Sequence, residues 1–245
     1  MSTLIAGKGA TYVDRFDLSI PPVPPATSTF TPIPHYDLAN TVRTISQDIL
    51  RDYFIFDERY VLAREGDQLF AVLDFKGEDK ETALAIGYRS SYDNSLALKL
   101  TTGASVFVCS NLMLSGDNIA VMKKHTKNLL IGLEDMIITA VYKAQHSHQR
   151  IIEDGNRLKN ISIEDRQAAR LLGQLFWDGI ISPRQVPVVR SEWLKPSHEE
   201  FQPRTAFSFY NCCNHALKTN TPISQTIERH ITLHKVMTEG GAIWS

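Results

Sequence analysis

The spacing of apolar positions changes along the chain near residue 116. From residue 52 to that point apolar residues alternate with polar ones or form short continuous runs, a pattern typical of β-strands. After it they recur every three or four residues, as in amphipathic helices. Strands followed by helices indicate an α+β fold. We therefore expect one α+β domain over 35–245, β-rich over 52–116 and helical over 128–237.

The β-rich part predicts a sheet of about five strands. Because the strands follow one another through short turns, a mostly antiparallel sheet is expected. The second apolar run is continuous, which favours a central place in the sheet. The five runs are YFIFDERYVLAR (53–64), LFAVLDF (69–75), TALAIGY (82–88), LALKLTT (96–102) and SVFVCSNLML (105–114).

Helical spacing predicts five helices, one before the strands and four after them. The longest begins near residue 128 and is expected to pack against the sheet. The segment 181–203, rich in proline and polar residues, is expected to be irregular. The predicted helices span 35–51, 128–153, 162–177, 204–219 and 222–237.

The N-terminal segment, residues 1–34, contains the proline-rich stretch IPPVPPATSTFTPIP. Proline fixes the backbone and removes an amide donor, so this stretch cannot be helical. Apolar residues punctuate it, which is unusual for a solvated linker. We expect an extended arm that packs on its own core or on a neighbouring subunit.

Composition limits the function classes. The chain has 245 residues, 43% of them apolar, and a formal net charge of -1, which excludes a globally basic nucleic-acid binder of the histone type. No apolar run is long enough for a transmembrane helix and no signal peptide is recognisable, so no membrane association and a cytoplasmic location are expected. The three cysteines lack C-x-x-C spacing, and reduced thiols, no cofactor and no metal site are predicted.

A polar segment, RSSYDNS, interrupts the strand pattern after Tyr88. Two interpretations fit it. Arg89 and Asp93 can form a charge-assisted pair that holds the turn into the next strand. Alternatively, Arg89 presents its planar guanidinium to a phosphate, while Ser91 and Asp93 orient it.

The densest positive charge is MKKHTK, residues 122–127, immediately before the longest predicted helix. Helix N-termini favour anions, although such a run is also typical of a solvated face. If Arg89 and Lys99 reach the same side of the sheet, they extend this charge into a stripe with Tyr88 or Tyr92 between the cations. Such a stripe is suited to single-stranded nucleic acid. The predicted contacts are Arg89, Lys99, Lys123, Lys124, His125 and Lys127.

Several longer motifs resemble a phage- and plasmid-associated protein family known as a domain of unknown function. The similar segments are FTPIPHYDL, YVLAREGDQLFAVLDF, GYRSSYDNSLALKLTTGASVFVCSNLMLSG, KKHT and EWLKPSHEEFQPRTAFSFYNCCNHALK, within about 30–237. In that family the polar segment usually has asparagine and histidine where this chain has Ser90 and Tyr92. The resemblance implies an origin in a mobile element.

Three functions are compatible with these observations. The first is a phage-type protein that binds nucleic acid, with single-stranded DNA favoured, without catalysis and as a homo-oligomer in the host cytoplasm. The second is a mobile-element protein that binds and inhibits a host protein such as a defence component. The third is a hydrolase or nuclease that uses Asp93 and His125; no motif such as G-x-S-x-G or H-E-x-x-H supports it.

Overall fold

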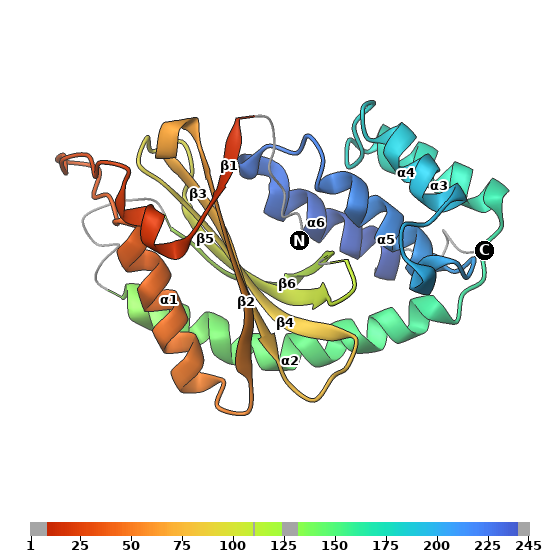
Figure 1. Cartoon of the computed structure of the whole chain (residues 1–245), viewed down its shortest axis with the longest axis horizontal. Helices are drawn as coiled ribbons and strands as arrows, with labels where there is room; N and C mark the ends of the chain where they lie inside the picture. Colours follow the sequence, from red (N-terminus) through yellow and green to blue (C-terminus); the bar gives the residue numbers. More distant parts are fainter. Residues whose placement is uncertain (1–8, 110, 124–131, 240–245) are drawn as a thin grey trace.

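A computed structural model describes residues 9–109, 111–123 and 132–239 of the chain, with the backbone alone for 115–123 (Figure 1). It contains one antiparallel sheet flanked by helices, and the part after the sheet is helical. The expected α+β fold with a helical C-terminal half is therefore confirmed.

The sheet has six strands that neighbour one another in chain order, β1 to β6. All pairs are antiparallel, as expected from the short connections. The additional strand, β1, comes from the N-terminal segment and pairs with β2. The strands are β1 Ala10–Val13, β2 Phe54–Ala63, β3 Gln68–Lys76, β4 Thr82–Ser91, β5 Leu98–Val106 and β6 Leu112–Lys123.

All five predicted helices are present, although their ends differ from the predicted ones. A sixth, α4, lies inside the segment that was expected to be irregular; Pro187 stands in its first turn, where a missing amide donor costs nothing. The helices are α1 His35–Ile49, α2 Leu133–Lys159, α3 Asp165–Trp177, α4 Val186–Leu194, α5 Ala206–Leu217 and α6 Ile223–Glu239, with short 3-10 turns at Arg15–Ser19, Arg64–Gly66 and Glu199–Phe201.

The described part of the N-terminal arm packs on the chain's own core. Residues 10–13 pair with β2 at the edge of the sheet. Leu18, Phe30 and Ile33 are buried, and Leu18 and Ile33 contact the core that α1 forms with the sheet. The arm therefore contributes a strand to the sheet and apolar side chains to the core.

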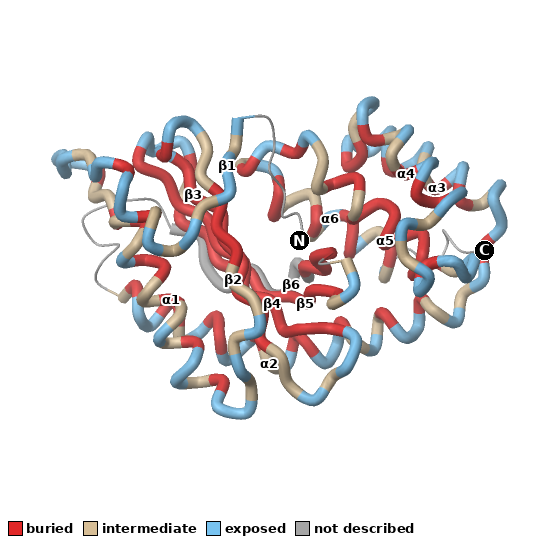
Figure 2. Tube along the Cα trace, in the orientation of Figure 1, coloured by how far each residue is buried: buried red, intermediate tan, exposed pale blue. Residues whose placement is uncertain are grey.

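The two faces of the sheet differ in chemistry. The first face is covered by α1 and α2 (Figures 1 and 2). Its apolar side chains, which include Leu73 and Ile86, belong to one buried cluster with Val42 of α1 and Ile137 of α2. The second face meets α6, and Phe70 of β3 and Ile227 of α6 belong to the same buried apolar cluster. Strand alternation also places four buried charged side chains on this second face. They are Arg59, Asp74, Arg89 and Lys99.

The three cysteines are free, and Cys212 and Cys213 are buried in α5. Burial raises the pKa of the Cys109 thiol to about 11 and that of Cys212 to about 12. The thiolate is the reactive form, so these thiols are protonated and unreactive at neutral pH.

Candidate nucleic-acid interface

The polar segment after Tyr88 closes the turn between β4 and β5. The Ser91 hydroxyl donates to the Leu96 carbonyl oxygen at 3.1 Å and accepts from the Leu96 amide at 3.0 Å. The Asp93 carboxylate accepts from the Ser95 amide at 2.9 Å and from the Arg64 guanidinium at 3.1 Å. Asp93 is thus held by Arg64 instead of Arg89, and these contacts stabilise the turn.

Tyr92 joins this turn to the start of α1. The His35 amide donates to the Tyr92 hydroxyl at 2.7 Å, and the two rings stack with centroids 3.8 Å apart. Tyr92 and Tyr88 are both buried, so neither ring is on the surface to stack against a base. The interleaved aromatic rings expected with the cationic stripe are therefore inside the protein.

Arg89 and Lys99 lie side by side, as the sequence predicted, because they are directly opposite each other on β4 and β5. Their side chains are only 7% and 5% exposed. Glu228 of α6 binds both: Oε2 lies 2.8 Å from Arg89 Nη1, and Oε1 lies 2.9 Å from Lys99 Nζ. Glu228 thus compensates one of the pair's two positive charges from within the chain.

A second ion pair lies on the same face of the sheet. Arg59 of β2 contacts the Asp74 carboxylate of β3, and both side chains are almost fully buried. Arg59 Nε also lies 3.2 Å from the Asp57 carboxylate. Burial raises the pKa of Asp74 to about 6, against the opposing attraction of Arg59. Both ends of the pair keep buried polar atoms that hydrogen-bond to no described residue, namely Arg59 Nε and Nη1 and Asp74 Oδ1.

The remaining predicted contacts fall on residues that the structure does not describe. Lys123 ends β6, opposite Leu98, but only its backbone is described. Lys124, His125 and Lys127 lie outside the described residues. Their proposed contact with phosphates stays a prediction, as does the hydrolase pairing of Asp93 with His125.

An exposed cluster of aromatic rings and a lysine lies where β2 begins and where β3 and β5 end. We define this Phe–Lys surface as Phe54, Phe56, Lys76 and Phe107. Phe54 and Phe56 are 59% and 52% exposed. The rings of Phe56 and Phe107 meet edge to face at 5.1 Å, and Lys76 Nζ lies 5.8 Å and 5.3 Å from their centroids. Among the described residues, no carboxylate pairs with Lys76 within 4 Å.

A pocket of about 480 Å³ adjoins the Phe–Lys surface and shares Phe107 with it. Lys159 of α2 lies 5.1 Å above the ring of Phe207 in this pocket and pairs with Glu81. Its wall combines aromatic rings with two lysines and two glutamates: Phe107, Phe201, Phe207, Lys80, Lys159, Glu81 and Glu200. The pocket thus offers flat apolar surfaces beside charged groups of both signs.

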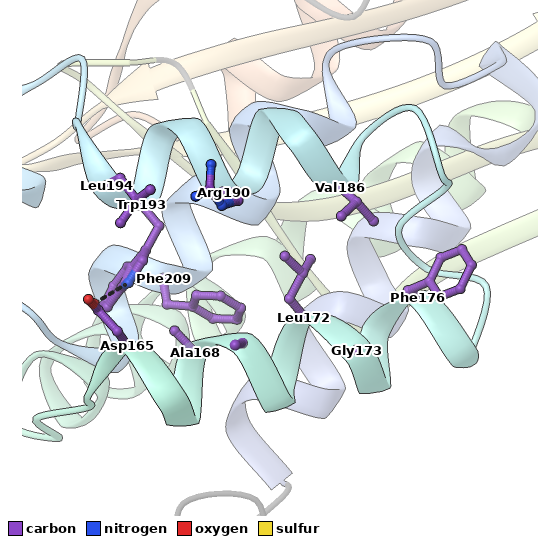
Figure 3. Close-up of a pocket in the computed structure, with 11 residues that line it drawn as sticks. Asp165, Ala168, Leu172, Gly173, Phe176, Val186, Arg190, Trp193, Leu194 and Phe209 are labelled. Atoms are coloured by element: carbon purple, nitrogen blue, oxygen red, sulfur yellow. Dashed lines mark hydrogen bonds between the residues drawn. The ribbon is translucent and has the colours of Figure 1, made fainter.

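A different surface lies between α3 and α4 (Figure 3). This α3–α4 groove has a volume of about 390 Å³ and an apolar wall, with Leu172 and Phe176 on α3 facing Val186 on α4. At one end, Trp193 Nε1 donates to the Asp165 carboxylate at 2.9 Å. Trp177, next to Phe176, is 84% exposed. Such exposed apolar surface is typical of contacts between proteins.

Sequence reasoning missed the Phe–Lys surface. Phe54 and Phe56 stand in a strand whose intervening residue, Ile55, is also apolar, so alternation does not separate an exposed face from a buried one. Phe107 was assigned to a strand, whereas it follows β5 in a turn. The one usable signal was Lys76, which ends an otherwise apolar strand.

Comparison with known proteins gives no relative: no family model, no curated protein and no solved structure matches this chain. The similarity of its motifs to the phage- and plasmid-associated family therefore stays a prediction. Among the described residues, no three His, Cys, Asp or Glu side chains form a group suited to a metal ion. No helix in the described part of the chain is both long and apolar enough to cross a bilayer.

Proposed function

We propose that this protein binds single-stranded nucleic acid, with DNA favoured, and does so without catalysis. The proposal includes an origin in a phage or other mobile element, a homo-oligomeric state and a location in the host cytoplasm. The Phe–Lys surface is the observation that carries the binding proposal.

Exposed rings beside a lysine that pairs with no described carboxylate suit single-stranded nucleic acid for two reasons. Bases of any sequence can stack on aromatic side chains, and a cation beside the rings can contact the backbone phosphates. Phe54 lies directly opposite Lys76 on the neighbouring strand, so ring and charge are fixed by the sheet. A base-paired duplex keeps its bases stacked internally, so the proposed surface should prefer single strands.

We expect Phe56→Ala to weaken the binding of a labelled oligothymidine by about tenfold, because stacking on one ring contributes about 1–3 kcal/mol. Lys76→Ala should lower the slope of log affinity against log salt by about 0.7, the loss of one phosphate contact. Fluorescence anisotropy with single-stranded and duplex DNA at several salt concentrations measures both effects.

Phe16→Ala is the matched control for this experiment. Phe16 is also an exposed phenylalanine with a cation above its ring, Arg15 at 5.1 Å, but it belongs to the arm. Its replacement should leave the affinity unchanged. Equal losses in Phe16→Ala and Phe56→Ala, or no binding at low salt, would contradict the proposal.

Binding to a host protein is the second candidate function, and the α3–α4 groove favours it. An apolar groove next to an exposed tryptophan can hold an apolar side chain or helix of a partner. Aromatic residues such as Trp177 often contribute most of the binding energy at such interfaces.

For this candidate, Trp177→Ser should abolish the capture of a host protein from nuclease-treated lysate, while leaving the affinity for DNA unchanged. The interface residues of greatest effect lose about 2–4 kcal/mol on truncation, which corresponds to at least thirtyfold in affinity. The control is Phe16→Ala, again an exposed aromatic outside the groove. If light scattering instead shows that Trp177→Ser dissociates a homo-oligomer, the groove is a self-contact and the host-protein candidate fails.

A further inference from the structure

The carboxylate of Glu228 bridges two buried cations that belong to neighbouring strands. One oxygen accepts from Arg89 and the other from Lys99, at 2.8 Å and 2.9 Å. Burial favours the protonated acid, but the hydrogen bond from Lys99 and the charge of Arg89 outweigh it and lower the pKa of Glu228 below its usual value. Glu228 is therefore ionised at neutral pH and acts as the anion of this group.

The cations are fixed by the sheet, whereas the anion comes from the surface. The side chains of Arg89 and Lys99 are 7% and 5% exposed, but that of Glu228 is 44% exposed. The Glu228 side chain thus keeps contact with solvent while its carboxylate binds the buried pair. Two buried positive charges without an anion are unfavourable, so a departing carboxylate must be replaced by another anion.

The cationic pair has donors beyond those that Glu228 uses. Arg89 Nε is buried and forms no hydrogen bond to any described residue. Arg89 Nη1 also donates to the Ser224 carbonyl oxygen at 2.6 Å, which fixes the guanidinium against α6. A guanidinium and an ammonium side by side suit a phosphate, whose oxygens can accept from both at once.

We propose that Arg89 and Lys99 form a phosphate site that Glu228 occupies from within the chain, and that a backbone phosphate of bound nucleic acid displaces the Glu228 carboxylate. This inference rests on the proposed function and adds to it a second contact with the nucleic acid, besides the Phe–Lys surface, that Glu228 regulates. Lys76 of the Phe–Lys surface has the same facing in the sheet as Arg89 and Lys99. The side chains between them on that face, such as Phe70 and Asp74, are buried, so the phosphate has to reach the pair from the exposed side of Glu228. Glu228 then sets the affinity by competing with the phosphate.

The first test is the affinity of the Glu228→Gln protein for labelled oligothymidine, measured by anisotropy. Removing the competing carboxylate should tighten binding by about tenfold, within the usual range for coupled sites. The matched control is Glu239→Gln, the same neutralisation on the same helix, because Glu239 is exposed and its described ion pair is with Lys235 at 3.8 Å. The control should tighten binding by less than about twofold, since exposed charges are screened.

The second test uses inorganic pyrophosphate and thermal unfolding, and needs no DNA. Pyrophosphate should raise the melting temperature of Glu228→Gln by several degrees more than that of the unmodified protein or Glu239→Gln, because only the first has a vacant cationic pair. Adding Arg89→Gln to Glu228→Gln should abolish this difference. If Glu228→Gln does not fold, Glu228→Asp, whose shorter side chain cannot bridge both cations, should show the same effects at smaller size.

The two tests separate the inference from the proposed function. If the protein binds DNA but Glu228→Gln binds no more tightly than Glu239→Gln, the inference is overturned and the nucleic-acid function stands. If pyrophosphate selectively stabilises Glu228→Gln but no variant binds DNA, the phosphate site is supported and the nucleic-acid function fails. Equal pyrophosphate shifts in all variants overturn the phosphate site itself.

Discussion

Replacing Arg59 by alanine is expected to lower the free energy of unfolding by about 3–5 kcal/mol, because it leaves the Asp74 carboxylate buried without its cation. Both side chains are almost fully buried, so water cannot replace the lost partner. Urea unfolding at pH 7 measures the change. For a chain of this length, the melting temperature should fall by about 10 °C.

Two variants control for the general effect of losing an arginine. Arg43→Ala removes a partly exposed pair with Glu58 and should cost less than about 1 kcal/mol. The double variant Arg59→Met with Asp74→Leu should recover most of the loss, since apolar side chains replace buried ion pairs well. A double variant as unstable as Arg59→Ala alone would contradict this account.

The same pair gives the unmodified protein a defined pH dependence. The pKa of Asp74 in the folded chain, about 6, lies above the usual value of 3.8. The folded protein therefore holds the proton of Asp74 more tightly than the unfolded chain does. The contribution of this group to stability is therefore complete below about pH 4 and is lost as the pH rises to about 6. In Arg59→Ala the attraction of Arg59, which lowers the pKa of Asp74, is gone. The loss of stability with rising pH should therefore be larger in this variant.

Gly103→Ala is the second replacement with a large expected effect, a loss of about 3 kcal/mol in the free energy of unfolding. Gly103 lies in β5 where the pairing with β6 shifts register. A Cβ atom there would overlap the carbonyl oxygen of Met113 and would lie 2.8 Å from Leu114 Cδ2. Because the overlap is with backbone in the sheet, the strands must move apart. Urea unfolding and amide hydrogen exchange of β5 measure the effect.

Gly173→Ala is the matched control, because a Cβ at Gly173 meets no atom within 4 Å. Gly173 lies inside α3, where alanine is favoured over glycine by about 0.5–1 kcal/mol. This variant should be slightly more stable than the unmodified protein. If Gly103→Ala is equally harmless, the close approach of β5 and β6 at this position is not a constraint on the fold.

Elements with a regular apolar period were predicted well, and those without one were not. The spacing of Leu38 and Val42 predicted α1, and both side chains are buried in the core between α1 and the sheet. The strand at residues 10–13 was missed because half its side chains are exposed at an edge and its pairing with β2 is a long-range contact. The helix at Val186–Leu194 was missed because its flanking prolines suggested irregular structure, although a proline in the first turn is compatible with a helix.

The candidate site shows a different limit. Alternation along two adjacent strands was enough to bring Arg89 and Lys99 together. It could not predict Glu228, which is 129 residues from Lys99 in sequence and belongs to a helix whose placement depends on tertiary packing. A local sequence pattern indicates which face a side chain occupies, but not which distant element covers that face.

The order of the elements along the chain also determines which side chains are synthesised before their partners. All the strands precede α6, and neighbours in sequence are neighbours in the sheet, so hairpins can form as the chain emerges. Lys99 is synthesised 129 residues before Glu228, a delay of roughly 6–26 s at about 5–20 residues per second. During translation, each nascent chain therefore passes through an interval in which Arg89 and Lys99 have been made but their internal counter-ion has not.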